Sequence, residues 1–254
     1  MESNSRSRLA SFLENPQKAL WTLAIPIMFG MGIHTLYNIV DMLFIGRLGG
    51  DAIAGVAFNM PIFFLMLGLT MGLGSGVTAS IARLIGEKDK RGADNSAEHA
   101  IAMAASISGV FTLLGIYFGK DILSMLGAEG DILTLGWDYL SMIVLGLPFM
   151  VFSGFFRSIL AGEGDMKFPM MVAGLGTILN IILDPIFIFD LEDYGNFGLG
   201  MGVKGAALAT VVSQLSVFLI FIYMLFVKEH AYITFNLKDF SPSRSILWDI
   251  IKVG

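Results

Sequence analysis

The sequence predicts an all-α membrane protein built as a six-transmembrane-helix bundle, and three observations carry this prediction. Hydrophobic residues make up 55% of the 254 residues and charged residues only 15%, whereas about a quarter of a soluble domain is charged. Six segments have the roughly 20 mostly apolar residues that a helix needs to cross about 30 Å of hydrocarbon. Short polar or glycine-rich joints separate those segments.

The joints differ in character and set the limits of the predicted spans. A glycine turn at 46–51 separates the first two spans, and a charged loop at 86–92 separates the second from the third. A turn at 162–165 follows the fourth span, and an acidic, glycine-rich loop at 190–202 follows the fifth. The expected spans are residues 20–45, 53–81, 97–118, 137–160, 168–189 and 205–227.

Lysine and arginine orient the spans, because these residues favour the cytoplasmic side of a membrane. If the N-terminus lies in the cytoplasm, the outer loops hold only Arg47, Lys120 and Lys204. The other 13 of the 16 basic residues then fall in cytoplasmic segments. The outer loops are otherwise acidic. This pattern predicts an even number of spans with both termini in the cytoplasm.

Composition and spacing also exclude several classes of protein. The chain has no cysteine, which rules out a disulfide framework and a thiolate metal site. Its net charge is −5 and it has no long basic block, so it shows no nucleic-acid footprint. No cleavage site follows an early apolar run, so we expect no cleaved signal peptide. Because no nucleophile–base pair or His-x-x-x-His spacing appears, we expect neither enzymatic activity nor a cofactor.

A polar stripe marks the first span. Four side chains spaced i, i+3, i+4 and i+7 share one helical face: His34, Tyr37, Asn38 and Asp41. Ionisable groups inside a span are costly and usually functional, so the stripe should face a cavity. Pro26 interrupts the hydrogen-bond ladder below the stripe and is a candidate hinge.

A second intramembrane carboxylate lies in the fifth span. Asp184 follows Asn180 by one helical turn, so the two side chains share a face. Pro185 cannot donate to the carbonyl of Ile181, which frees an acceptor beside the carboxylate. These oxygens suit a proton or a small hard cation such as Na⁺. Since Asp41 and Asp184 lie at similar depth, we expect them to share one site and to hold a proton between them.

Structural interpretations stay open for several of these residues. Asp41 is close enough to the outer end of its span to be interfacial, and His34 could be a donor in helix packing. Arg157, near the inner end of the fourth span, either extends to the inner headgroups or lines the cavity. Glu98 and His99, at the cytoplasmic start of the third span, are expected at the membrane interface. Three glycines of the second span indicate close helix packing: Gly72, Gly74 and Gly76.

The tail after the sixth span divides the chain further. Residues 228–242 are polar, and residues 243–248 then resemble residues 17–21, the approach to the first span. The tail is either the start of a truncated second repeat or an amphipathic cytoplasmic segment. We therefore expect a cytoplasmic segment at 1–18, a transmembrane lobe at 19–227, and a linker with the start of a second repeat at 228–254.

Four motifs together resemble a known transporter family. They are DMLFIGRLG at 41–49, GEGDMKFP at 162–169, NIILDP at 180–185 and GVKGAALAT at 202–210. In this order they resemble the multidrug and toxic compound extrusion (MATE) family, in particular its DinF-like branch. The resemblance covers nearly the whole chain from about residue 16 and corresponds to the N-terminal half of the family's twelve-helix fold.

The resemblance implies a function and a set of site residues. The family exports organic, typically cationic, compounds in exchange for H⁺ or Na⁺, without a cofactor. Its N-terminal lobe holds the coupling ion at the positions matching Asp41, Asn180 and Asp184, and Thr210 is the best match for a further ligand. Tyr37 and Asn38 match polar cavity residues of the family, and Tyr139 and Arg157 fall on the lobe interior; His34 is expected to line the same cavity. Arg157 departs from the usual asparagine and would repel a cationic substrate.

The expected setting is a multi-pass protein of the cell membrane. Its expected partners are the bilayer, a small organic substrate and a missing C-terminal lobe or second copy of the chain. Two alternatives remain at this stage. One is a lipid or lipid-linked oligosaccharide flippase of the same superfamily, and the other is a membrane scaffold without transport activity.

Overall fold

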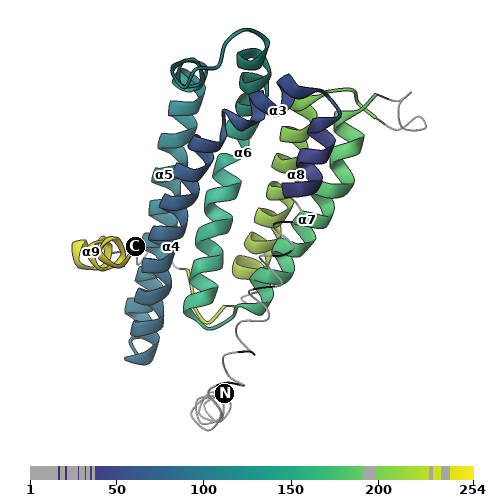
Figure 1. Cartoon of the computed structure of the whole chain (residues 1–254). Helices are drawn as coiled ribbons and strands as arrows, with labels where there is room; N and C mark the ends of the chain where they lie inside the picture. The colour runs from purple at the N-terminus through teal and green to yellow at the C-terminus, as the bar shows by residue number, and fades with distance from the viewer. Residues whose placement is uncertain are drawn as a thin grey trace.

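A computed structural model describes residues 38–190, 198–228, 231–235 and 241–254, together with positions 17, 21, 28, 32 and 35. These residues are mainly helical, and they contain an isolated antiparallel bridge between Asp190 and Leu199 but no strand. After a helix at 38–46, the order is α3 (Gly50–Ala57), α4 (Met60–Gly86), α5 (Lys90–Met125), α6 (Gly130–Gly162), α7 (Lys167–Ile188), α8 (Val203–Ile222), a π-helix η1 (Tyr223–Val227) and α9 (Arg244–Val253) (Figure 1).

Five helical stretches of the described residues are long and apolar enough to cross a membrane. They are Gly50–Gly86, which joins α3 and α4, Lys90–Met125, Gly130–Gly162, Lys167–Ile188 and Val203–Val227. These stretches coincide with the second to sixth predicted spans. The first predicted span, with Pro26, His34 and Tyr37, lies mostly outside the described residues. The prediction of an all-α membrane bundle is confirmed.

The helices are longer than the sequence analysis predicted. The third predicted span, 97–118, lies inside a helix that runs from Lys90 to Met125. The predicted loop at 86–92 is present but shorter, at residues 87–89, because α4 extends to Gly86 and α5 begins at Lys90. The Asp89 side chain caps α5 by accepting a hydrogen bond from the Gly92 N–H at 2.9 Å. The length of an apolar segment corresponds to the thickness of the hydrocarbon that it crosses. A helix can be longer than this segment, because its backbone hydrogen bonds also form outside the lipid.

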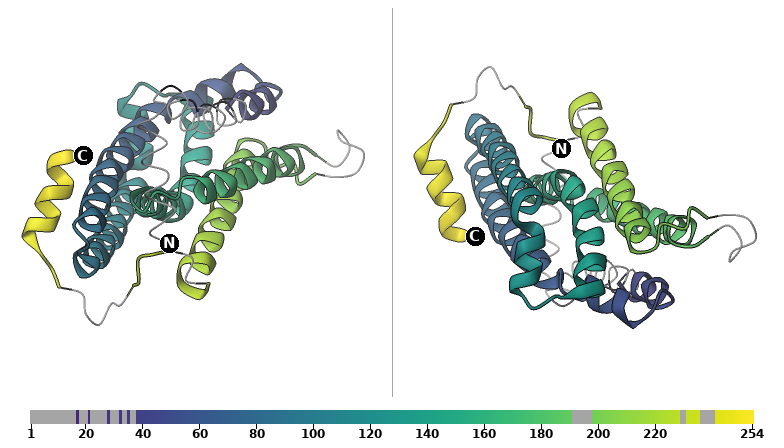
Figure 2. Two further views of the ribbon diagram at one scale, coloured as in Figure 1. Left: turned by 90° about the horizontal axis from the view of Figure 1, so that it is seen from below. Right: turned by 90° about the horizontal axis from the view of Figure 1, so that it is seen from above.

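Helix α6 is the centre of the bundle. It packs against α3, α4, α5 and α8. Of the residues in its most apolar stretch, 61% are buried, whereas the share is 28% or less in each of the other four candidate spans. Viewed along the bundle, α6 lies between the α4–α5 pair and the α7–α8 pair (Figure 2). Gly55 and Gly136 let α3 and α6 approach closely, since a Cβ atom on either would lie 2.9 Å from the other's backbone.

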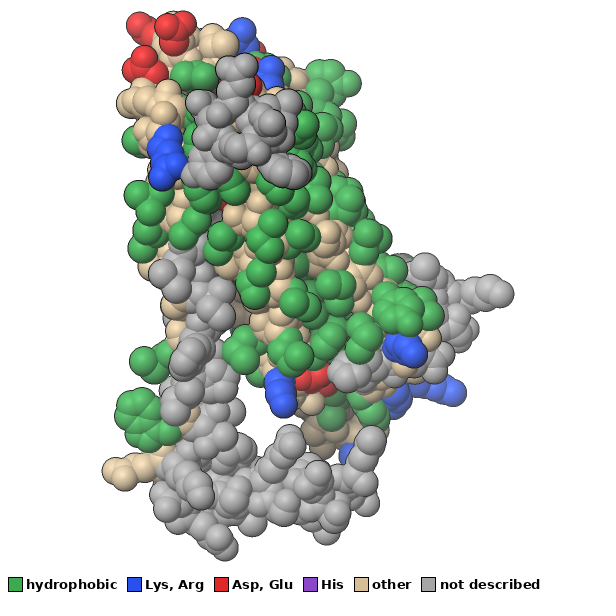
Figure 3. Space-filling model, turned by 90° about the vertical axis from the view of Figure 1, so that its right-hand side faces the viewer, with side chains coloured by type: hydrophobic (Ala, Val, Ile, Leu, Met, Phe, Trp, Pro, Cys, Tyr) green, Lys and Arg blue, Asp and Glu red, His purple; other side chains and the backbone are tan. Residues whose placement is uncertain are grey.

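The outer surface matches a lipid environment. Large apolar side chains are widely exposed, for example Phe64 at 67% and Leu43 at 64%. On the face shown in Figure 3, hydrophobic side chains fill the middle and charged side chains lie towards the two ends. A contiguous apolar surface of this kind would be unstable in water, but it needs no cover in hydrocarbon.

The segment after η1 is anchored through its main chain to the end of the bundle where α6 finishes. The carboxylate of Glu163, in the turn after α6, accepts hydrogen bonds from the Tyr232 N–H at 2.9 Å and the Ile233 N–H at 2.7 Å. Asp94 on α5 accepts from the N–H and the hydroxyl of Thr234, both at 2.9 Å. Burial raises the pKa of Glu163, and the two N–H groups oppose that shift by stabilising its charged form.

A second anchor begins at the next residue of α5 and extends about one turn further along the helix. His99 Nε2 accepts a hydrogen bond from the Ser243 N–H at 2.9 Å, while Asn95 Nδ2 donates to the carbonyl of Ser241 at 3.0 Å. Glu98 and His99 are only 5% and 2% exposed, and the expectation that they lie at the level of the membrane interface stays a prediction. They are buried because the returning segment packs over the end of the bundle, and its hydrogen bonds satisfy the imidazole there.

Helix α9 docks on α4 through glycine. Ile250 is fully buried, and a Cβ atom on Gly76 would overlap its carbonyl oxygen. At the ends of this contact, Gly72 lies against Gly254, and Arg83 pairs with Asp249 at 2.7 Å. Gly74 lies against the Ser158 side chain of α6, so close packing is confirmed for all three glycines predicted to provide it.

Glu163→Ala should release the anchored segment. Each hydrogen bond to a charged acceptor contributes about 1.5–3 kcal/mol, so amide exchange at Tyr232 and Ile233 should accelerate at least about 10-fold. Hydrogen–deuterium exchange of the full-length protein measures this. Glu87→Ala is the matched control, because Glu87 is exposed at the end of α4. Equal exchange in the two variants would contradict the anchor.

Gly76→Ala should displace α9 from α4, because an overlap with the Ile250 backbone cannot be relieved by rotating a side chain. Overpacking of this kind costs about 1–3 kcal/mol, so exchange across α9 should rise about 10-fold. Gly68→Ala is the control on the same helix, since a Cβ atom there would meet nothing within 4 Å. The same protection of α9 in both variants would count against the docking.

Candidate functional site

Asp41 lies on the helix at 38–46 and is 7% exposed. That helix packs against the end of α7, where the rings of Phe44 and Phe189 are 6.0 Å apart and nearly perpendicular. Ile45, on the next position, is fully buried in the core. Asp41 therefore faces protein rather than lipid or the outer surface, which answers the open question of an interfacial role.

Asp184 and Asn180 lie on α7 and are 0% and 2% exposed. Their spacing of four residues places them on one face of the helix, as the sequence predicts. Pro185 stands inside α7 and cannot donate to the Ile181 carbonyl. The carboxylate of Asp184 therefore lies beside a backbone acceptor that the helix itself does not use.

Asn180 joins Asp184 to α8. In one orientation of its amide, Nδ2 is 3.3 Å from Asp184 Oδ1 and 3.4 Å from Thr210 Oγ1. With the amide turned by 180°, Nδ2 donates to Asp184 Oδ2 at 3.0 Å and the amide oxygen accepts from the Thr210 N–H at 3.2 Å. We prefer the turned amide, because it makes shorter bonds with matched donors and acceptors. Thr210 is 6% exposed, so the predicted trio meets in the protein interior.

Glycine sets the separation of α7 and α8. A Cβ atom on Gly205 would overlap the carbonyl of Phe187, and one on Gly176 would lie 2.5 Å from Val217 Cγ2. These contacts lie on either side of the Asn180–Thr210 pair along the two helices. The backbones can therefore approach closely enough for a short amide side chain to bridge them.

The two carboxylates interact electrostatically with each other. Within the described residues, Oδ1 of Asp41 is buried without a hydrogen-bond partner, and an unsatisfied oxygen of this kind is costly. Two close carboxylates, an amide and a hydroxyl fit a proton or a monovalent hard cation. The described residues contain no group of three or more His, Cys, Asp or Glu side chains that could hold a metal ion.

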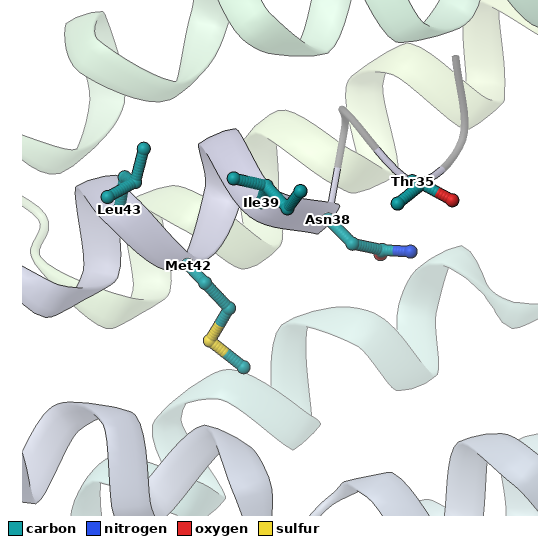
Figure 4. Close-up of a pocket in the computed structure, with 5 residues that line it drawn as sticks. All are labelled: Thr35, Asn38, Ile39, Met42 and Leu43. Carbon is teal, nitrogen blue, oxygen red and sulfur yellow. The ribbon is translucent and has the colours of Figure 1, made fainter. Parts of the chain in front are cut away.

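The predicted cavity residues have different surroundings. Asn38 is exposed and lines a shallow pocket of about 380 Å³ with Thr35, Ile39, Met42 and Leu43. In Figure 4, Met42 points from the helix towards the opposite side from Leu43. Tyr139 on α6 is 5% exposed and packs edge-on against Phe63, with ring centroids 6.2 Å apart. The roles predicted for these residues in substrate binding stay predictions.

Arg157 is exposed on α6. Its neighbours Gly154 and Ser158 face α4, and Phe156 stacks on Phe218 of α8 at 6.1 Å. Arg157 therefore lies on the side of α6 between α4 and α8, away from α5. No ion pair joins Arg157 to a carboxylate of the described residues.

Sequence reasoning missed several buried polar side chains, Asn59 and Ser213 among them. Asn59, fully buried between α3 and α4, donates to the carbonyls of Gly55 at 2.9 Å and Gly136 at 3.2 Å. Ser213 follows Thr210 by three residues on α8 and is 2% exposed. The only feature of the sequence that marks Asn59 and Ser213 is a small polar residue within an apolar stretch. Such residues are too common in membrane helices to indicate a buried polar site.

Fold and site together define a multi-pass α-helical membrane protein with a carboxylate pair in its interior. A sequence profile of the MatE family matches residues 26–186, more than half of the chain. The chain belongs to the MatE family, whose members are transporters and not enzymes.

Known proteins similar to this chain agree with the family assignment. Multidrug export protein MepA of Staphylococcus aureus (strain MRSA252) is 31% identical over 240 residues, covering 93% of this chain and 51% of the relative. A crystal structure of MATE in the bent conformation is 40% identical with a TM-score of 0.84, covering 94% of this chain and 51% of its own. The chain spans about half the length of the relatives it matches.

A further solved structure comes from Pyrococcus furiosus Vc1. It is a transporter of the MOP superfamily, described as having a binding pocket of reverse polarity that suggests a different function. It is 40% identical with a TM-score of 0.85, covering 94% of this chain and 51% of its own. The similarity again concerns one half of a longer protein.

Gly205→Ala should separate α8 from α7 and break the contact between Asn180 and Thr210. We expect a loss of about 1–3 kcal/mol in the free energy of unfolding, measured as a lower Tm of the full-length protein in detergent. Gly174→Ala on α7 is the control, because a Cβ atom there would meet nothing within 4 Å. Equal Tm values would show that the close approach is not needed.

Proposed function

We propose that this chain is the N-terminal lobe of a cation-coupled antiporter that exports organic compounds. The observation that carries the proposal is the burial of Asp41 and Asp184, from two different helices, close enough to interact. Burying two carboxylates in a membrane protein costs free energy. Such pairs are typical of ion and proton pathways. The name of the relative MepA, a multidrug export protein, supports export as the direction of transport.

The coupling ion in this proposal is H⁺ or Na⁺, held by Asp41, Asn180, Asp184 and Thr210. A charged pair of carboxylates repels itself at low dielectric, and one bound monovalent cation relieves that repulsion. The site therefore changes its net charge by one unit when it is loaded. This change in charge can favour one conformation of the lobe over another, and ion binding would be coupled to transport in this way.

Loading of the site would act on the helix that carries Asp41. Binding draws Asp41 towards α7, and the strain passes down this helix to Pro26, which lies outside the described residues. Bending there would shrink the lobe cavity and expel the substrate outward. Solved structures described as MATE in the bent and in the straight conformation support a change of shape in this family. His34, Tyr37, Asn38, Tyr139 and Arg157 would line the cavity.

The whole transporter would need a second six-helix lobe or a second copy of this chain. The half-length match to every relative described above supports this. Residues 228–254 would link the lobes and begin the second repeat, with both ends of the lobe in the cytoplasm. The expected location is the cell membrane.

A different substrate class has one specific observation in its favour. Arg157 is an exposed cation between α4 and α8, where it would attract an anionic or zwitterionic compound. The pocket of reverse polarity described for the Pyrococcus furiosus protein supports the same alternative. A lipid or lipid-linked substrate carries the phosphate that such an arginine binds well.

Asp41→Asn and Asp184→Asn should each abolish ion-coupled export, because a neutral amide cannot gain or lose the coupling charge. The loss should be at least about 100-fold if coupling depends on a carboxylate that titrates or binds a cation. The assay is ethidium efflux by the full-length protein in proteoliposomes under an imposed H⁺ or Na⁺ gradient.

Asp131→Asn is the matched control, because Asp131 is exposed at the outer start of α6. It should export at the wild-type rate. Full export by Asp41→Asn and Asp184→Asn would contradict the antiporter. If wild type also fails to export, the scaffold alternative is favoured.

A further inference from the structure

Helix α9 has an apolar side that the described residues leave uncovered. Trp248 is 65% exposed and Ile251 is 50% exposed. Ile250, which stands between them in the sequence, is fully buried and its backbone lies against Gly76 of α4. Residues two positions apart lie on nearly opposite sides of an α-helix, so Trp248 faces away from α4. Only one of the two apolar sides of α9 is therefore packed on the bundle.

Helix α9 lies across the bundle rather than along it. In Figure 1 it is seen nearly end-on beside α4 and α5, while α4, α5 and α6 run up the view. In both views of Figure 2, which look along the bundle, α9 (yellow) is seen from the side. Since the long apolar helices cross the bilayer, α9 runs roughly parallel to the membrane surface.

The contacts of α9 place it at the boundary between hydrocarbon and headgroups. Ser243, the residue before the helix, donates its N–H to His99, which lies about 3 Å along α5 from the predicted start of the third span at residue 97. Ile250 meets Gly76, which lies about 8 Å along α4 from the predicted end of the second span at residue 81. A helix that lies in the membrane interface buries its apolar side about 5–10 Å into the boundary between headgroups and acyl chains. The depth of α9 matches that position.

Basic residues flank the exposed apolar side. Arg244 lies one turn before Trp248 and Lys252 one turn after it, and both are exposed. Neither forms an ion pair in the part of the chain that the structure describes. The one acidic residue of α9, Asp249, pairs with Arg83 of α4 at 2.7 Å. The uncovered side of α9 is therefore apolar at its centre and positively charged at both ends.

The composition of this side distinguishes a bilayer from a second protein surface. Tryptophan is enriched at the membrane–water interface, where its ring lies at headgroup level. A long basic side chain at that depth can keep its apolar stem in the lipid and its charge at the phosphates. Interfaces between proteins are instead depleted in lysine. The position of Lys252 beside Trp248 therefore favours lipid over a protein partner.

We propose that α9 is an interfacial anchor, in which Trp248 and Ile251 insert into the leaflet at the end of the bundle where α6 finishes. Arg244 and Lys252 bind the phosphates of anionic phospholipids there. A ten-residue helix is too short to be stable by itself in water. Docking on α4 keeps α9 helical and at the right depth for lipid binding. The anchor goes beyond the proposed antiporter and does not depend on it.

Brominated lipids test the insertion, because bromine quenches the fluorescence of a tryptophan that it contacts. The full-length protein is prepared with Trp248 as its only tryptophan, which in this chain requires Trp21→Phe and Trp137→Phe. It is then reconstituted into vesicles of phosphatidylglycerol and phosphatidylcholine. Bromine close to the headgroups should quench Trp248 at least about two-fold more strongly than bromine near the ends of the acyl chains, since α9 lies at the interface.

The same vesicles measure the preference for anionic lipid when only one of the two lipids is brominated at a time. One basic residue near a negatively charged membrane surface favours the anionic lipid about 5-fold. The quenching should therefore show a preference for phosphatidylglycerol of at least about 5-fold, and Arg244→Gln combined with Lys252→Gln should reduce it below about two-fold. Lys120→Gln is the control, because Lys120 is exposed near the opposite end of α5. It should keep the wild-type preference.

A spin label gives an independent measurement if the protein without its other tryptophans does not fold. This chain has no cysteine, so Ile251→Cys provides a single labelling site in it. In vesicles, the label should collide more often with oxygen, which concentrates in lipid, than with a water-soluble nickel complex. Electron paramagnetic resonance measures both collision rates. A label that collides more often with the nickel complex would contradict the insertion.

The remaining outcomes also overturn the proposal. Emission of Trp248 at the wavelength of a water-exposed tryptophan, without quenching, would show that this side of α9 faces solvent. Blue-shifted emission without quenching would show that a protein surface, from a second lobe or a second copy, covers it. Quenching without a preference for phosphatidylglycerol, or a preference that survives Arg244→Gln with Lys252→Gln, would contradict the binding of anionic headgroups.

Discussion

The close contact between α7 and α8 is the constraint on which the rest of the site depends. Hydrocarbon offers no hydrogen bonds, so every polar group inside the bundle must find its partner in the protein. Asn180 can bridge Asp184 and Thr210 only because Gly205 and Gly176 let the two backbones approach. The glycines therefore act on the chemistry of the site although they carry no functional group.

The same requirement explains the rest of the architecture. Asn59 satisfies two carbonyls where α3 ends and α4 begins, at the point where Gly55 meets Gly136. At the end of the bundle where α6 finishes, Glu163 and Asp94 bind main-chain groups of the segment that leaves the bundle. Anchoring through the backbone holds this segment whatever its side chains are. It places α9 on the flank of α4, and a following lobe would start from this fixed point.

A buried polar group that the protein leaves unsatisfied is then informative. Most hydroxyls of the described helices return to their own backbone, as those of Thr70, Ser106 and Ser216 do. Within the described residues, six buried side-chain atoms have no partner, on Asp41, Asn59, Asn95, Thr112, Ser153 and Ser213. Asp41 is the one carboxylate among them. An unsatisfied carboxylate oxygen beside Asp184 is what the proposed ion site would require.

The sequence by itself determined the membrane class, the second to sixth spans and the pairing of Asn180 with Asp184. Each of these follows from local rules, namely apolar length against lipid thickness and a four-residue spacing on one helix. It also predicted that Asp41 and Asp184 share a site, from their similar depth. Only the tertiary structure decided the true helix ends, the burial of Glu98 and His99, and the place of Ser213. These features depend on which segments of the chain meet across the bundle. The hydropathy of the sequence does not indicate contacts between segments that are distant in the chain.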